Sequence, residues 1–191
     1  LGTEINAVHK EPLNVQLRIA LAFPDLYEVG MSYVGQKILY HEVNKYSDYW
    51  AERVFAPSLE AAKIIRQRGA LLSTLESDRP LRDMHVLAFS LTHELAYTSV
   101  LYMLDLAGIA FYAKQRQGIF PLVIAGGGAM FNPEPVASFF DLVVIGDGEE
   151  VFPEILGVIN RLKNEVTDKK ELVLALKDIS GVYIPGLFSV S

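Results

Sequence analysis

The chain has 191 residues, of which 51% are hydrophobic and 21% charged, and its formal net charge at pH 7 is −6. This composition is typical of one folded domain, or of one domain with an appendage, that buries a sizeable core, and it excludes a disordered chain. Because Lys and Arg form no cluster and the net charge is negative, we do not expect nucleic acid as a partner of this domain.

The sequence contains no cysteine, so this chain alone builds no disulfide, no thiolate zinc site and no iron–sulfur cluster. No apolar run reaches the roughly 18 residues of a membrane span, and no signal peptide is visible. We therefore expect a cytoplasmic protein without a membrane partner. The first residue, Leu1, and an abrupt end after residues 185–188 indicate a piece of a longer protein.

The first elements form a strand–loop–helix unit. Residues 1–14 are polar and are interpreted as a lead-in segment, and the largely apolar residues 15–23 predict a buried strand that Pro24 ends. Apolar residues at helical spacing from 32 to about 46 predict the following helix. The loop between them lies at the carboxyl end of a strand, which is the edge at which open α/β sheets bind ligands.

The same alternation continues along the chain. A short strand is expected at 53–56, followed by a helix from the N-cap Ser58 to Gly69. Residues 71–75 fit either a short strand or an extended connection. The later elements that we expect are strands at 84–89, 109–112, 122–125 and 142–145, helices at 94–106, 133–140, after 150 to about 163 and 168–177, and an extended piece at 182–184.

The order of these elements predicts a parallel sheet with right-handed crossovers. We therefore expect a flavodoxin-like (Rossmann-like) three-layer α/β sandwich. Its sheet would be five-stranded and mainly parallel, with the strand order 2-1-3-4-5.

The residues of special chemistry follow the strands. Glycine lets a backbone come close to a ligand, and the helix N-termini beside these loops offer free N–H groups. Because the carboxyl ends of parallel strands share one edge, the loops predict a single ligand-binding rim. The candidate binding residues are Asp25, Tyr27 and Gly30 after the first strand, Ser90 and Leu91 after the strand at 84–89, Gly126 and Gly127 after the strand at 122–125, and Gly146, Gly148 and Glu149 after the strand at 142–145.

Other site patterns are incomplete in this sequence. His93-Glu94 lacks a second His one turn later, where Tyr97 stands, so the zinc-protease helix pattern fails. A dinucleotide-binding loop needs Gly-x-Gly-x-x-Gly after the first strand, where only Gly30 and Gly35 lie nearby. No nucleophile–base pair is recognisable. We therefore predict no catalytic residue and no metal-binding residue.

Three of the motifs resemble the cobalamin-binding domain of methyltransferases, mutases and many radical SAM enzymes. That family carries Asp-x-His-x-x-Gly, Ser-x-Leu and Gly-Gly after its first, third and fourth strands. The corresponding segments here are Asp25-x-Tyr27-x-x-Gly30, Ser90-Leu91 and Gly126-Gly127. Tyr27 stands where the family has its axial histidine, so the resemblance implies base-off cobalamin without a lower histidine, or a domain that has lost the cofactor. The cofactor's tail would lie between Gly30, Ser90 and Gly126-Gly127.

A closer resemblance runs over nearly the whole chain, to the amino-terminal domain of a large family of uncharacterised radical SAM proteins. In that family the module precedes a radical SAM barrel with a Cys-x-x-x-Cys-x-x-Cys motif. The resemblance implies that a barrel of the same polypeptide is the partner, and that the 4Fe-4S cluster and S-adenosylmethionine bind there and not in this domain. The segments that carry it are 23–32, 52–57, 89–91, 104–109, 125–127, 132–135 and 145–150.

The chain then divides into a lead-in at 1–14, a cobalamin-binding-like domain at 15–165, and a C-terminal helix and linker at 166–191. The first hypothesis is a module of a radical SAM enzyme that is not catalytic alone and that binds, or once bound, cobalamin. The alternative is a cofactor-free interaction domain that docks the barrel or a macromolecular substrate. For two candidate binding residues a purely structural role also stays open. Asp25 would then cap a turn, and Glu149 would place a favourable charge at a helix N-terminus.

Overall fold

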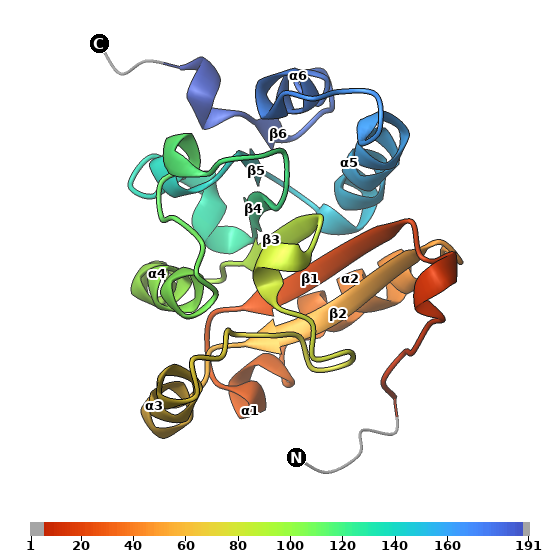
Figure 1. Ribbon diagram of the computed structural model, residues 1–191. Helices are drawn as coiled ribbons and strands as arrows, with labels where there is room; N and C mark the ends of the chain where they lie inside the picture. Colours follow the sequence, from red (N-terminus) through yellow and green to blue (C-terminus); the bar gives the residue numbers. More distant parts are fainter. Residues whose placement is uncertain (1–5, 189–191) are drawn as a thin grey trace.

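The computed structural model describes residues 6–188, which form a central sheet between two layers of helices (Figure 1). The sheet has six strands in the order β2-β1-β3-β4-β5-β6. The first five strands run parallel, and β6 is antiparallel to β5. The strands are β1 Leu17–Phe23, β2 Tyr49–Phe55, β3 Val86–Ser90, β4 Leu122–Gly126, β5 Leu142–Val144 and β6 Val182–Tyr183.

The sheet confirms the predicted α/β class, and the first five strands follow the order 2-1-3-4-5. The predicted count of five strands is corrected to six. The extended piece expected at 182–184 pairs with β5, with Val182 opposite Val144 and Tyr183 opposite Val143. An unpaired edge exposes N–H and C=O groups, and β6 covers that edge of β5.

Two helical layers cover the sheet. The helices are α1 Tyr27–Gly30, α2 Val34–Asn44, α3 Leu59–Gln67, α4 Tyr97–Leu106, α5 Gly148–Leu162 and α6 Lys169–Leu174. Residues of α3 and α4 pack in one buried cluster, and residues of α2, α5 and α6 pack in the cluster on the opposite face. Ser58 caps α3 as predicted, because its Oγ accepts a hydrogen bond from the N–H of Ala61 at 3.2 Å.

The second strand is longer than the predicted 53–56, since β2 begins at Tyr49. Two charged side chains explain why the first part of this strand was not predicted. Glu52 is fully buried and accepts hydrogen bonds from Arg18, and Arg53 pairs with Glu76 at 2.6 Å. From the sequence, a charged residue is expected at the surface unless a partner for it is known. The partners of these two residues, Arg18 and Glu76, lie elsewhere in the chain.

Two expected elements did not form. The helix predicted at 133–140 is only a 3-10 turn, Ala137–Phe139, because Pro135 disfavours the helical conformation at the residue before it. The strand predicted at 109–112 is absent from the described part of the chain. There the guanidinium of Arg116 donates to the carbonyls of residues 110 and 111, which removes acceptors that a ladder would need.

The ends of the described chain pack against this fold. Residues 1–5 of the predicted lead-in and 189–191 of the predicted C-terminal segment lie outside the described residues. The N–H of Val8 donates to the hydroxyl of Tyr40 at 2.7 Å, which holds residues 6–8 over α2. Leu172 and Ile184 of the C-terminal segment are buried in the core cluster that α2 and α5 share.

Within residues 6–188, no helix is both long enough and apolar enough to cross a membrane. The same residues contain no group of three or more His, Asp or Glu side chains placed to hold a metal ion.

Candidate functional site

A small cavity opens at the carboxyl ends of β3, β4 and β5, where the sequence predicted a rim. Its volume is about 260 Å³. The cavity gathers six of the predicted site residues, from three different loops. Its lining residues are Tyr33, Gly35, Leu39, Ser90, Gly126, Gly127, Gly128, Phe131, Val144, Gly146, Asp147, Gly148 and Glu149.

The floor of this cavity is one row across the sheet. Ser90 of β3 is paired with Gly126 of β4, and Gly126 is paired in turn with Val144 of β5. Successive strand residues point to opposite faces, so these three share a face. That face is covered by α2 and α5, since Val144 belongs to their core cluster. Ser90 and Gly126 are small, which leaves a slot between the sheet and the two helices.

Gly126 keeps the slot open. A Cβ on this residue would lie 3.6 Å from the Cβ of Val144, an ordinary contact, so a side chain fits there without a clash. A larger side chain would extend from the floor into the slot. On the opposite wall, Tyr33 packs its ring against Phe23, with ring centroids 5.3 Å apart, and Leu39 follows it on α2.

Gly127 and Gly146 have a different role, because both adopt backbone conformations that favour glycine. Gly127 has φ +106°, and Gly146 has φ +114°. These residues turn the chain sharply at the ends of β4 and β5. The backbone therefore borders the slot closely at both turns.

The first turn of α5 borders the slot as well. Asp147 is the N-cap residue, but its side chain accepts no hydrogen bond from the helix, and Glu149 lies in the first turn. Glu149 lines the slot and also lies where the helix dipole favours a carboxylate. Both interpretations of Glu149 thus remain compatible with its position.

The remaining predicted site residues lie outside this cavity. The carboxylate of Asp25 accepts a hydrogen bond from the N–H of the next residue, Leu26, at 2.7 Å. The ring of Tyr27 packs edge-to-face on Phe55 at 5.3 Å between centroids. Gly30 is required by packing, because a Cβ there would overlap the Phe55 ring. Leu91 is fully buried in the core, next to the turn at Gly127.

The α2 wall of the slot was missed by the sequence analysis. Gly35 and Leu39 lie one turn apart on α2, so helical spacing places them on one face. Nothing local indicates that this face meets the strand ends rather than solvent. Phe131, which follows β4, was missed for the same reason.

Large apolar side chains are exposed around the same rim. Leu59 follows β2, Leu95 follows β3 and Phe131 follows β4, and their exposed fractions are 78%, 86% and 77%. Leu26 and Val29 of the loop after β1 are also exposed. Such a concentration on one edge is typical of a surface that contacts another molecule.

The slot combines polar and apolar groups in its lining. The slot offers the Ser90 hydroxyl, glycine backbone and apolar walls from Leu39 and Val144. Its ionisable lining residues, Tyr33, Asp147 and Glu149, include no acid–base pair that any hydrogen bond joins within the described chain. A narrow slot with small floor residues suits an extended or flat part of a ligand.

Comparison with protein-family models identifies a related family. A family model described as "Radical SAM proteins, N-terminal" matches residues 35–185. The matched part includes β2 to β6, both helical layers and most of the slot, and begins after β1. No match was found among curated proteins or among solved structures.

Proposed function

The chain belongs to the family of N-terminal domains of radical SAM proteins, and from that premise we propose that it holds the tail of base-off cobalamin. It would do so as a non-catalytic module, next to the radical SAM barrel of the same polypeptide. The cluster and S-adenosylmethionine would bind in that barrel.

The observation that supports cobalamin most is the floor of the slot. Ser90, Gly126 and Val144 form one row across three strands, and the first two leave room between the sheet and α2. The nucleotide tail of cobalamin is long, narrow and ends in a flat base. It needs an open channel at the carboxyl edge of a sheet, and this slot has that location.

Particular residues would hold the tail. The Ser90 hydroxyl and the backbone at Gly126–Gly128 would contact its polar part, and Leu39 and Val144 would pack on the flat base. When bound, cobalamin supplies a cobalt centre for group-transfer chemistry. Tyr27 stands at the motif position of the axial histidine and packs on Phe55, so the proposal includes no lower imidazole ligand.

The test is a titration with aquocobalamin followed by its visible absorbance. We compare it with aquocobinamide, which has the same corrin ring but lacks the nucleotide tail. Tighter binding of cobalamin, by about tenfold or about 1.4 kcal/mol, supports a site for the tail. Equal binding of the two compounds, or no spectral change at tenfold excess, contradicts the proposal.

A matched pair of variants locates the binding. Gly126→Val fills the slot floor, whereas Gly157→Val adds the same atoms on α5, where a Cβ meets no atom within 4 Å. We expect Gly126→Val to lose cobalamin binding and Gly157→Val to keep it. Retained binding in Gly126→Val would place the cofactor elsewhere.

A second candidate function is a cofactor-free interaction domain that docks the barrel or a macromolecular substrate. The exposed rim residues Leu59, Leu95 and Phe131 favour it, because large apolar side chains exposed along one edge are available to pack against a partner. The two candidates are separated by the titration above, since the docking function requires no cobalamin.

A further inference from the structure

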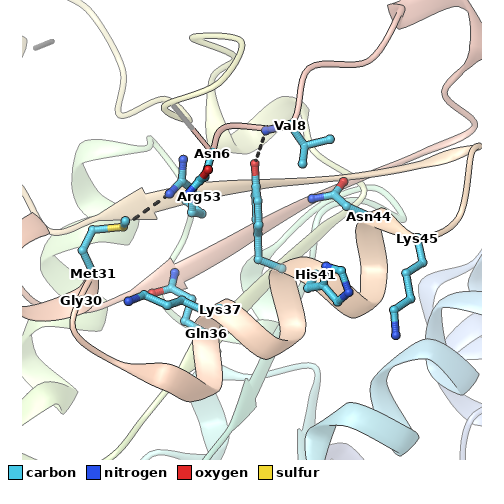
Figure 2. A pocket seen from close by; sticks show the side chains of 11 residues that line it. Asn6, Val8, Gly30, Met31, Gln36, Lys37, His41, Asn44, Lys45 and Arg53 are labelled. Atoms are coloured by element: carbon cyan, nitrogen blue, oxygen red, sulfur yellow. Dashed lines mark hydrogen bonds between the residues drawn. The ribbon is translucent and has the colours of Figure 1, made fainter. Parts of the chain in front are cut away.

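A second cavity lies on the other flank of α2, away from the slot (Figure 2). Gly35 and Leu39 face the slot, whereas Gln36 and Tyr40 line this second cavity. Its volume is about 480 Å³, within the range of small-molecule sites. The lining residues are Asn6, Val8, Gly30, Met31, Gln36, Lys37, Tyr40, His41, Asn44, Lys45 and Arg53.

Among the described residues, the Lys, Arg and His side chains that line this cavity make it basic. Lys37 and His41 of α2 and its C-cap residue Lys45 follow one another at four-residue intervals, so they form a stripe along the cavity. Lys45 pairs with Glu42 at 2.5 Å, but Lys37 and His41 have no ion-pair partner among residues 6–188. Within residues 6–188 no carboxylate lines the cavity, although the whole chain has a net charge of −6.

The rest of the lining suits an organic molecule. Val8, Met31 and the ring of Tyr40 provide apolar surface, and the guanidinium of Arg53 lies 4.8 Å from the centroid of that ring. Figure 2 shows Met31 and Arg53 at one end of the cavity and His41 and Lys45 toward the other. A ligand that fills it would therefore have an apolar part and an anionic part.

Gln36 adds a polar group that needs a partner. Only 3% of this residue is exposed, and its Nε2 donates to the carbonyl of Leu21 at 3.0 Å. Its Oε1 is buried and accepts no hydrogen bond from any described residue. A buried acceptor without a hydrogen bond destabilises the empty site, and only a ligand N–H group that reached this oxygen would remove that penalty.

We propose that this cavity binds a phosphorylated organic molecule of nucleotide size. The phosphate lies beside Lys37 and His41, and the organic part packs on Met31 and Tyr40. The volume, the apolar lining and the basic stripe point to this class. The proposal goes beyond the cobalamin function and does not depend on it, because the site lies on the opposite flank of α2.

The chain carries a natural reporter for this cavity. Trp50 is the single tryptophan, and its indole N–H donates to the carbonyl of Val8 at 3.0 Å. Val8 lines the cavity, so a bound ligand changes the environment of the indole. We would titrate the protein with ADP and with adenosine, and follow tryptophan fluorescence and the heat of binding in parallel.

We expect ADP to bind at least about tenfold more tightly than adenosine, because only ADP carries phosphate for the basic stripe. The double variant Lys37→Gln/His41→Gln should lose about tenfold or more of the ADP affinity. Lys63→Gln, which removes an exposed charge on α3, is the matched control and should bind ADP like the parent chain.

Three outcomes would overturn the proposal. The first is no heat and no fluorescence change with ADP at millimolar concentration. The second is equal affinity for ADP and adenosine, and the third is an equal loss in Lys63→Gln and in the double variant. Gly126→Val separates this site from the slot, since it should keep ADP binding whether or not cobalamin binds.

Discussion

Gly127 lies directly against the carbonyl oxygen of Leu91, so that a Cβ on Gly127 would be 2.5 Å from that oxygen. The same carbonyl accepts the N–H of Ala129 at 3.0 Å, which fixes the turn after β4 against the end of β3. Close approach and a φ of +106° both require glycine at this position. Gly126, one residue earlier, has neither constraint.

The contrast predicts different effects of the same substitution at two neighbouring positions. Gly127→Ala should lower the free energy of unfolding by about 1–3 kcal/mol, because its backbone conformation is nearly restricted to glycine. Gly126→Ala should change it by less than about 1 kcal/mol. Urea unfolding of the two variants measures the difference. Equal stability of both would show that the turn relaxes around a Cβ.

A buried carboxylate joins three segments of the chain. Glu52 is fully buried and accepts hydrogen bonds from Arg18 at 3.2 Å, from Thr74 at 2.7 Å and from Ser77. Glu52→Ala should lower the free energy of unfolding by about 3–5 kcal/mol, since the guanidinium of Arg18 loses its buried partner. Chemical denaturation measures the loss.

The control for Glu52 is Glu42, which forms an exposed ion pair with Lys45 at 2.5 Å. Exposed pairs contribute little, so Glu42→Ala should change stability by no more than about 1 kcal/mol. A loss in Glu52→Ala as small as that of Glu42→Ala would mean that water replaces the carboxylate without cost.

These residues show what could be predicted from the sequence. Strands β1, β3, β4 and β5 were located because their apolar runs fit a sheet buried on both faces. The start of β2 was not located, because Glu52 and Arg53 are expected at the surface when their ion-pair partners are unknown. Those partners, Arg18 and Glu76, lie far away in sequence. The strand β6 depends on a partner that lies far away in sequence.

The candidate site was predictable to the extent that it follows strand ends. Ser90, Gly126 and Gly148 meet at the slot because parallel strands bring their carboxyl ends together. The wall of the slot that Tyr33 and α2 form was not predictable. Helical spacing shows which residues share a face of the helix, but not which part of the fold that face contacts. The basic stripe beside the second cavity is a regular i, i+4 pattern, but the segment at 6–8 that encloses it is distant in sequence.

The stability of the fold should depend on pH through His85. Burial, together with the neighbouring cations Lys163, Arg79 and Arg18, lowers the pKa of His85 from 6.5 to about 4. Its Nδ1 accepts the N–H of Arg18 at 3.0 Å, so the folded chain requires the neutral ring. The unfolded chain protonates this histidine near its ordinary pKa.

The sign of the effect follows from that difference. The contribution of His85 is fully present above the unfolded pKa and is lost as the pH falls from about 6.5 to about 4. Within that range the parent chain should lose about 1–3 kcal/mol more stability than His85→Asn, whose side-chain oxygen still accepts from Arg18. Urea midpoints of both proteins across the range measure this. Parallel curves would exclude His85 as the titrating group.

The exposed apolar rim gives the last prediction. Replacing Leu59, Leu95 and Phe131 with Ser should change the free energy of unfolding by less than about 1 kcal/mol, because these side chains are 77–86% exposed. If the rim docks the radical SAM catalytic domain, the triple variant should bind that domain, added in trans, at least about tenfold more weakly. Sedimentation measures the association.

Leu13→Ser is the control, because Leu13 is 93% exposed but lies on the 3-10 turn Pro12–Asn14, away from the rim. An equal loss in the control, or no loss in the triple variant, would show that docking uses another face.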